Sequence, residues 1–395
     1  METVIAKTDE RAVRVAESIY HFCIALMPVL YLFRVPVLNI SLGTILLIVF
    51  IPHSLVYVLS GLTKVRRFAM IPFLVFYVYL IARTKGNLNN FLLCVATVIN
   101  LWGIYCGSIK TERIRKIIEC AALIFAALVF FQTLCYYALG MKLKMLPKAL
   151  ILDIFQESYV FRNDPGMYRP SAIFLEPSHF AQYCCFALIS VLFPVEGKAN
   201  LKKAAIIAAG CVLTTSGMGM AVTAGIIVWY VLFTKQYPEK KLLTIIGGFA
   251  AAVMAFVVLM QIPFFKTAVQ RVFSTVDGYN AIQGRTRHIS DAIGTMSGKT
   301  LLFGYGGNAE YPYYLAGLPD TIFKYGIIGT VLELMCFAWL MLEKGQNYVL
   351  CTSISFLALF CVAHLTSFYI QVFYFGLIIA DVVTGNDTKR IRIVL

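Results

Sequence analysis

The sequence predicts an all-α polytopic membrane protein with about twelve transmembrane helices. Two features of its composition lead to this fold class: 60% of the 395 residues are hydrophobic, and only 14% are charged. A soluble domain carries about 25% charged residues. The chain therefore holds more apolar sequence than one core can bury, and a bilayer is its expected solvent. We expect one integral membrane domain that covers residues 1–395.

Apolar runs of transmembrane length recur along the whole chain. A spanning helix needs about 20 mostly apolar residues, so the run at 204–216 is the weakest, with a rise of only about 20 Å. No cleavable signal peptide is expected, because the first apolar run starts late and is followed directly by another. The predicted spans cover residues 17–34, 41–60, 68–82, 90–108, 117–137, 171–195, 204–216, 217–233, 242–262, 321–342, 348–366 and 368–383.

The charges in the loops predict the orientation. If the N-terminus is cytoplasmic, the cytoplasmic stretches hold 20 Lys and Arg in 64 residues, and the outer stretches hold 12 in 104. This contrast is the positive-inside pattern. We therefore expect both termini in the cytoplasm and two long outer loops, at 138–170 and 263–320. The net charge of +14 is explained by topology and does not indicate a nucleic-acid partner.

The first outer loop runs into a polar helix start that is a candidate site. Its residues run from Arg169 through Glu176 to His179, and the last two lie three residues apart on one helical face. Ionisable groups near or within a membrane are costly and mark functional sites. The alternative is a structural contact of Glu176 that ties the loop to the bundle.

The second outer loop carries two arginines and a histidine, followed by a glycine-rich turn. Arg285, Arg287 and His288 suit a phosphate or pyrophosphate, because a guanidinium is always charged and binds two oxygens at once. The turn Phe303-Gly-Tyr305-Gly-Gly-Asn308 allows close approach of the backbone. The alternative for a single loop arginine is a solvated side chain.

Further polar residues are expected near the same outer edge. The small turn at 214–219, which includes Ser216, follows a helix too short to cross, so it is expected to lie in a cavity or in a helix contact. Asp320 closes the second loop, and Lys324 follows one turn later. Snorkelling toward water is the alternative role for Lys324. No metal-ligand spacing and no Asp-x-Asp cluster is present, so neither a cofactor nor a metal is expected.

At these motifs the sequence resembles the O-antigen and capsule polymerases of the Wzy type, which belong with the O-antigen ligases. The resemblance covers the plan of the whole chain: about twelve spans, two large outer loops and cytoplasmic termini. Its local marks are RPSAIFLEPSHFAQY at 169–183, TTSGMGM at 214–220, GRTRHISDAIGTMSGKTLLFGYGGN at 284–308 and FKYGIIGTVLEL at 323–334.

This resemblance implies a metal-independent inverting glycosyltransferase of the GT-C type in a bacterial inner membrane. Its substrate would be a glycan linked to undecaprenyl pyrophosphate, and a flippase and a chain-length regulator would be its partners. Arg169 and Arg285 (or Arg287) would hold the pyrophosphate, and Glu176, His179 or Asp320 would be the general base. The expected substrate-binding residues are Arg287, His288, Tyr305, Asn308, Tyr313, Tyr314, Lys324 and Ser216.

The sequence departs from the family pattern at two places. Ligases and some relatives carry a His-Asn pair eleven residues before the glycine matched by Gly326, whereas this chain has Leu315 there. Where the family often has an arginine after the serine of its small turn, this chain has Gly217. The first departure argues against a ligase, which would share the same chemistry and differ in its acceptor.

Two functions of a different class also compete with the polymerase interpretation. One is a flippase or transporter for lipid-linked units. Many transporters contain an inverted repeat, and the sequence shows none, which argues against this function. The second is a non-catalytic membrane scaffold, which would leave the placement of the arginines without an explanation.

Overall fold

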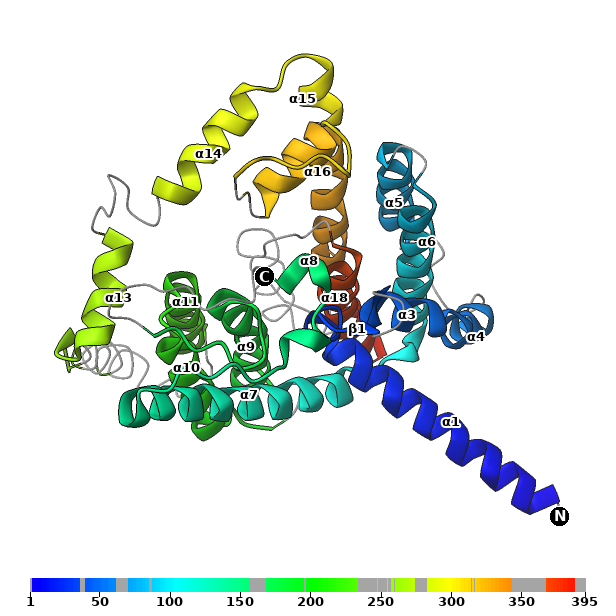
Figure 1. The fold of residues 1–395 in the computed structure, drawn as a ribbon. Coiled ribbons are helices and arrows are strands. Elements are labelled where there is room, and N and C mark those ends of the chain that lie inside the picture. The colour runs from blue at the N-terminus through cyan, green and yellow to red at the C-terminus, as the bar shows by residue number, and fades with distance from the viewer. Residues whose placement is uncertain are drawn as a thin grey trace. The chain divides into compact units, whose positions relative to one another are not determined.

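The computed structural model is mostly helical (Figure 1). The residues that it describes form two compact units, which we treat one at a time. Unit 1 comprises Met1–Ile118, Leu150–Leu152 and Ile289–Leu395, and unit 2 comprises Glu119–Ala149 and Asp153–His288. The described residues are 2–35, 40–61, 70–84, 87–156, 168–194, 197–233, 260–273, 283–313, 317–342 and 367–387, with positions 247, 254, 257, 258 and 315.

Several helices are apolar enough to belong to a membrane protein. Four are also long enough to cross a bilayer: Leu42–Ser60, Leu88–Tyr105, Thr111–Leu139 and Leu318–Leu340. Four shorter apolar helices are Ile71–Arg83, Pro177–Leu192, Gly217–Val231 and Phe368–Val383. These eight helices coincide with eight of the predicted spans and support an all-α membrane protein. The predicted span 348–366, and most of 242–262, lie outside the described residues.

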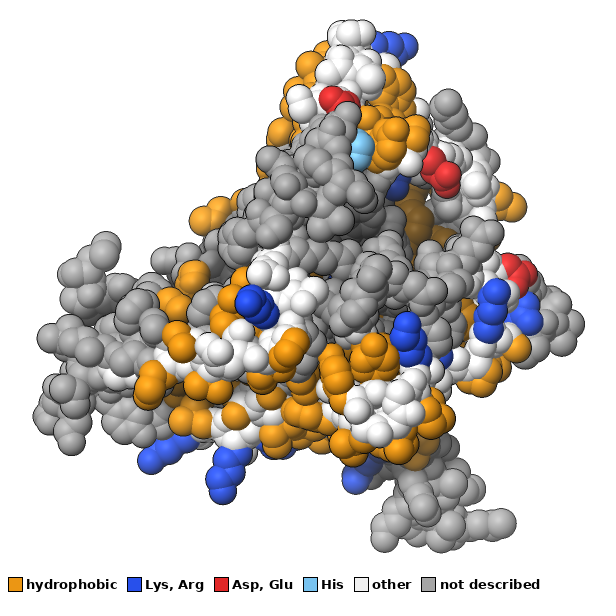
Figure 2. Space-filling view, turned by 60° about the vertical axis from the view of Figure 1, so that its left-hand side comes forward, with side chains coloured by type: hydrophobic (Ala, Val, Ile, Leu, Met, Phe, Trp, Pro, Cys, Tyr) orange, Lys and Arg blue, Asp and Glu red, His pale blue; other side chains and the backbone are white. Residues whose placement is uncertain are grey.

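Large apolar side chains are exposed on the surfaces of these helices (Figure 2). On α7 (Thr111–Leu139), Leu134 is 65% exposed and Ile124 is 60% exposed. Exposed apolar surface on this scale is unfavourable in water, and it is the surface that lipid tails solvate. The exposure pattern therefore agrees with the composition of the chain.

Unit 1 is built on contacts between segments far apart in the sequence. Helix α5 packs against α16, and α6 packs against both α4 and α18. A buried polar contact joins α1, α4 and α6, because Ser54 of α4 donates to Asn100 Oδ1 of α6 at 2.9 Å and Tyr20 OH of α1 lies 3.3 Å from Ser54 Oγ. The elements that the described residues of unit 1 form are α1 (Glu2–Ala25), α2 (Met27–Leu30), β1 (Arg34–Val35), β2 (Ile40–Ser41), α3 (Leu42–Val49), α4 (Ile51–Gly61), α5 (Ile71–Arg83), α6 (Leu88–Gly103), η1 (Ile104–Ser108), α15 (Lys299–Phe303), α16 (Leu318–Leu342) and α18 (Phe368–Asp387).

Unit 2 is organised around α9 (Pro177–Leu192), whose side chains are almost all buried. Helices α10 (Leu201–Leu213) and α11 (Gly217–Phe233) both pack against it (Figure 1). Close packing depends on glycine: a Cβ atom on Gly210 would lie 3.0 Å from Ala126 Cβ, and one on Gly219 would lie 2.4 Å from Ala181 Cβ. The other described helices of unit 2 are most of α7, the short α8 (Asp153–Gln156) and α13 (Pro263–Phe273), while the 3-10 helix η2 (Lys148–Leu150) and α14 (Gln283–Gly294) each run from unit 2 into unit 1.

Three expectations about these elements need correction. The predicted span 17–34 is not one helix, because α1 ends at Ala25 and α2 starts anew with Pro28 in its first turn. The span expected from residue 171 begins only at Pro177, after an extended Glu176. The segment 263–320, expected outside as a loop without secondary structure, contains α13, α14 and α15.

Candidate functional site

The predicted site residues of the first loop gather at the start of α9. Glu176 occupies the N-cap position in an extended conformation, and its Oε2 accepts a hydrogen bond from Ser178 Oγ at 3.2 Å. The backbone N–H of His179 donates to the Glu176 carbonyl at 3.1 Å. The helix therefore places Glu176 and His179 one turn apart, and both side chains are half-buried.

A buried glutamine ties the segment before α9 into unit 2. Gln132 Oε1 accepts from the N–H of Ala172 at 2.8 Å, and Gln132 Nε2 donates to the carbonyl of Leu143 at 3.0 Å. Ala172 has φ 50°, a conformation that is uncommon outside glycine, so this bond holds a strained residue. Tyr168 OH donates to the same Leu143 carbonyl at 3.1 Å. Gln132 and Tyr168, which are far apart in the sequence, thus both bind the carbonyl of Leu143.

The tie at Leu143 brings forward a residue that sequence reasoning missed. Lys144 follows Leu143 and Arg169 follows Tyr168 in the sequence. The hydrogen bond between Tyr168 OH and the Leu143 carbonyl therefore joins the two segments that carry these cations. Burial lowers the pKa of Lys144 below its ordinary value, and the charge of Glu176 partly opposes this shift. Lys144 and Glu176 are therefore electrostatic neighbours in a partly desolvated setting.

The small turn before α11 is buried, as its sequence predicted. Thr214, Thr215 and Ser216 are at most 5% exposed, and Thr215 has φ 54°. Ser216 Oγ accepts from the N–H of Gly219 at 3.2 Å, and Gly219 packs directly on Ala181 of α9. Helix α11 therefore starts against α9, and Ser216 uses its hydroxyl as a cap of α11.

The arginines of the second loop lie on a helix and not in a turn. Residues 284–288 belong to α14. Arg285 and Arg287 lie two residues apart on α14, while their side chains lie outside the described residues. His288 is half-buried.

The glycine-rich turn at 303–308 lies in unit 1, against a sharp bend in α16. The bend is at Gly326, with φ 69° and ψ −172°. The N–H groups of Tyr305 and Gly306 donate to the carbonyls of Phe323 and Lys324 at 3.0 and 2.9 Å. These bonds replace the intrahelical ones that the bend removes. The turn therefore serves as the backbone partner of the broken helix.

Two side chains of α5 complete this contact, and neither was predicted. Tyr79 OH donates to the carbonyl of Tyr325 at 2.7 Å, and Arg83 Nη2 donates to the carbonyl of Gly304 at 2.8 Å. Both bind backbone oxygens, which leave no signature in the local sequence. We therefore assign Tyr79 and Arg83 to holding the bend.

The two charged candidates of α16 bind each other. Lys324 Nζ lies 3.0 Å from Asp320 Oδ2, and the two side chains are only 17% and 10% exposed. The arm of α16 before Gly326 thus carries an ion pair that is largely shielded from solvent. Asp320 is engaged by Lys324, which weakens its standing as a general base.

The remaining substrate-binding candidates of unit 1 have mostly structural contacts. Asn308 Oδ1 accepts from Asn90 Nδ2 at 3.1 Å, and Tyr305 OH donates to the carbonyl of Thr295 at 2.8 Å. Tyr305 also packs with Phe323 in a small apolar cluster. Tyr313 is 56% exposed, and Tyr314 lies outside the described residues.

The predicted residues therefore fall into two groups. Unit 2 holds Arg169, Glu176, His179 and Ser216, with the backbone of Arg285, Arg287 and His288; unit 1 holds Asp320, Lys324, Tyr305, Asn308 and Tyr313. The structure places Glu176 and His179 at the start of α9, Arg169 in the segment that leads into it, and Ser216 in the turn before α11, which packs on α9. Lys144 interacts with Glu176, and Gln132 binds the segment before α9. The sequence marks neither residue as part of a site, because each is only a single polar residue in or near an apolar run.

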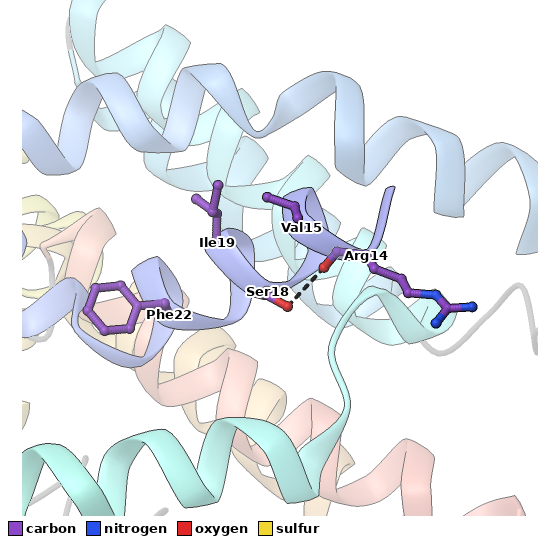
Figure 3. Close-up of a pocket in the computed structure, with 5 residues that line it drawn as sticks. All are labelled: Arg14, Val15, Ser18, Ile19 and Phe22. Carbon is purple, nitrogen blue, oxygen red and sulfur yellow. Dashed lines mark hydrogen bonds between the residues drawn. The ribbon is translucent and has the colours of Figure 1, made fainter. Parts of the chain in front are cut away.

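A shallow groove on α1 does not suit a sugar. Arg14, Val15, Ser18, Ile19 and Phe22 line it, all from this one helix, and Ser18 Oγ donates to the Arg14 carbonyl at 2.8 Å (Figure 3). The three apolar side chains are each 51% exposed. Such a surface fits lipid tails better than a polar glycan.

Comparisons with known proteins do not assign the chain to a family. No family model matches it, and no curated protein sequence matches it. Within the described residues, no group of three or more His, Cys, Asp or Glu could hold a metal ion. The assignment of function therefore depends on the residues themselves.

Proposed function

We propose that this protein is a polymerase of oligosaccharide repeat units linked to undecaprenyl pyrophosphate. It would act on the outer face of a bacterial inner membrane. The observation that supports this function is the polar site at the start of α9, where Glu176 and the partly desolvated Lys144 interact beside a buried helix. An acid and a cation at the end of an apolar helix suit a substrate with a lipid tail and a charged head.

The proposed reaction is one displacement at the anomeric carbon of the donor glycan. A hydroxyl oxygen of the incoming lipid-linked unit attacks this carbon and forms the new glycosidic bond. The bond from the same carbon to the pyrophosphate oxygen breaks, and undecaprenyl pyrophosphate leaves with the electron pair. The proton of the attacking hydroxyl passes to a general base. Configuration at the carbon is inverted, and the energy comes from the lipid pyrophosphate linkage.

The site of unit 2 offers groups for each part of this reaction. Arg169, with Arg285 or Arg287, would stabilise the negative charge that grows on the leaving pyrophosphate. Lys144 would add a further positive charge near the same point. Glu176 would accept the proton of the attacking hydroxyl, because its carboxylate lies at the start of α9 and is only half-buried. His179, one turn further on, is the second candidate for this base.

A transporter of the same lipid-linked units is the second candidate function. The broken helix α16 and the fully buried Glu333 favour it, because discontinuous helices and ionisable groups deep in the membrane are common in transporters. The acid and the cations near the start of α9, which lie next to a predicted outer loop, favour the polymerase.

A test in detergent separates the two functions, because no membrane then divides two compartments. Purified protein receives synthetic undecaprenyl-pyrophosphate-linked units and an excess of chelator. A polymerase should lengthen the glycan and release undecaprenyl pyrophosphate, whereas a transporter makes no covalent product. Arg169→Ala and Glu176→Gln should each lower the rate at least about 100-fold, in the range for removal of a charge-stabilising or acid–base group.

Controls make this test decisive. Gln156→Ala changes a residue of the same loop whose side chain binds its neighbour Asp153, and it should elongate glycans as the parent does. No elongation by folded parent protein with authentic units would overturn the proposed function.

A further inference from the structure

A buried carboxyl in unit 1 has no role in the site proposed above. Glu333 lies on α16, seven residues beyond the bend at Gly326, and it is 1% exposed. Neither of its two carboxylate oxygens has a hydrogen-bond partner among the described residues. A buried carboxyl without a partner is rare and calls for a specific explanation.

The residues around Glu333 are polar but supply no positive charge. Tyr77 lies close enough for its hydroxyl to interact electrostatically with Glu333, and this hydroxyl donates to Gln371 Oε1 at 2.7 Å. Gln371 is also 1% exposed, and its Nε2 has no acceptor among the described residues. The Thr321 hydroxyl is the one described neighbour that interacts with the Glu333 carboxylate as a donor, and it competes for this hydrogen with the carbonyl of Gly317 at 3.4 Å.

The titratable groups that interact with Glu333 are all acids, and the cations on neighbouring elements are engaged elsewhere. Arg83 of α5 binds the Gly304 carbonyl, and Lys324 of α16 binds Asp320. Helix α15 carries only Lys299, which is exposed at its start. Helix α18 carries the uncharged Gln371 and the acids Asp381 and Asp387, and no cation. The described titratable groups that act on Glu333, or on which it acts, are Tyr77 of α5 and Asp320, Tyr325 and Cys336 of α16.

Physical chemistry leaves one stable form for such a group. An ionised carboxylate in an apolar interior without a counter-charge costs many kcal/mol, so the group takes up a proton instead. A second negative charge near Asp320 would add repulsion, because Lys324 neutralises only one of them. The neutral acid avoids both costs and gains an O–H donor.

We propose that Glu333 is a proton-binding site inside unit 1, a carboxylic acid that holds its proton at neutral pH. The ligand of this site is a proton, and Glu333, Gln371 and Tyr77 form its polar surroundings. Asp320 and Lys324 form an ion pair on the arm of α16 before Gly326, and Glu333 lies on the arm after it. With a bound proton Glu333 is neutral, so Asp320 alone balances the charge of Lys324. The site is independent of the glycan chemistry proposed for unit 2.

Infrared spectroscopy of the purified full-length protein tests this proposal directly. Glutamate labelled with carbon-13 at its side-chain carboxyl distinguishes Glu333 from the buried Asp381 of α18. At pH 7 ordinary glutamates, with a pKa of about 4.3, are ionised. The parent should therefore show a protonated-glutamate band at pH 7, and this band should be absent in Glu333→Gln. The amide has the shape of the neutral acid, so this variant should unfold at the same temperature as the parent.

The control is another half-buried glutamate that does have a cation. Glu119 of unit 2 lies 3.2 Å from Lys203 Nζ, so Glu119→Gln should leave the band unchanged. No band in the parent at pH 7, or a band that survives in Glu333→Gln, would overturn the proposal. Loss of the band when sodium replaces choline in the buffer would also overturn it, because a cation would then be the ligand. A titration of the parent alone decides the matter if the variant fails to fold.

Discussion

Gly304 and Gly326 each occupy a position where the other's segment leaves no room for a side chain. A Cβ atom on Gly304 would lie 2.2 Å from the carbonyl oxygen of Lys324, and one on Gly326 would lie 2.4 Å from the carbonyl oxygen of Leu302. Both residues have positive φ. The glycine-rich turn and the bend of α16 therefore depend on each other, and this dependence makes a first prediction.

Gly304→Ala and Gly326→Ala should each destabilise the protein strongly. The positive φ alone costs about 1–3 kcal/mol, and the contact with a backbone oxygen adds to it. The measurement is the unfolding temperature of the purified protein in detergent. Gly294→Ala is the matched control in the same unit, because nothing lies within 4 Å of its added Cβ atom. Equal unfolding temperatures for all three variants would show that the turn and the bend are not packed as described.

The Asp320–Lys324 ion pair should show strong energetic coupling. Removal of one partner by Asp320→Asn or Lys324→Met leaves a shielded charge alone and should cost about 3–5 kcal/mol. The double variant should regain much of this loss, as a double-mutant cycle on unfolding would reveal. Additive losses would show that the two groups act independently. A stable double variant that elongates no glycan would restore Asp320 as a catalytic candidate.

Gln132→Leu should release the segment before α9. The change leaves the N–H of Ala172 without its 2.8 Å bond, and a buried unsatisfied donor costs about 1–3 kcal/mol. We expect faster proteolytic cleavage between residues 138 and 170, together with slower glycan elongation. Gln156→Ala serves again as the control within the same loop. Parent-like cleavage in Gln132→Leu would rule out this role for the glutamine.

Lys144 should react with amine-specific reagents at lower pH than an ordinary lysine. Burial lowers its pKa, and the Glu176 charge raises it, so Glu176→Gln should lower the pKa further. The folded state binds fewer protons than the unfolded state in this range. Stability should therefore rise with pH between the lowered pKa and the ordinary value of about 10.4. Labelling rates read by mass spectrometry, with the exposed Lys142 as internal reference, measure the effect. Equal rates at the two lysines would contradict it.

The orientation in the membrane remains a prediction from loop charge, and the structure supplies good probe positions. Ser290 is exposed on α14, in the segment expected outside, and Lys202 is exposed at the start of α10, in a segment expected inside. An impermeant thiol reagent should label Ser290→Cys in intact cells and Lys202→Cys only after permeabilisation, each compared with the parent. The reverse pattern would invert the predicted topology.

Composition and hydropathy were enough to predict most of the helical framework. Eight predicted spans coincide with apolar helices because each apolar run is long and bounded by polar or turn residues. The break between α1 and α2 and the late start of α9 were missed, although Pro28 and Pro177 mark both places. A proline within or beside an apolar run can mark the start of a new helix. An average of hydropathy over the whole run does not detect this boundary, because the neighbouring residues are apolar.

The candidate site was predictable only where ionisable groups stand close together in the sequence. Glu176 and His179 were predicted as site residues from their spacing, from the nearby Arg169 and from their place at the expected membrane edge, and the structure puts the two residues one turn apart. Lys144 was not, because its place depends on Gln132 and Tyr168, which meet at the Leu143 carbonyl through tertiary contacts. The ion pair of Asp320 and Lys324 follows from an i, i+4 spacing, but its shielding from solvent depends on the bend in α16.

The division of the chain into units has a consequence for biosynthesis. Unit 1 is discontinuous: its helices α5 and α6 precede unit 2, and their partners α16 and α18 follow it. A ribosome that makes the chain from its N-terminus therefore finishes unit 2 while α5 still lacks α16, and while α6, although already in contact with α4, still lacks α18. Insertion factors that shield unpaired helices should be needed mainly for this early part. A stop codon after unit 2 should then yield a fragment in which α9, α10 and α11 are assembled but residues 70–103 are degraded.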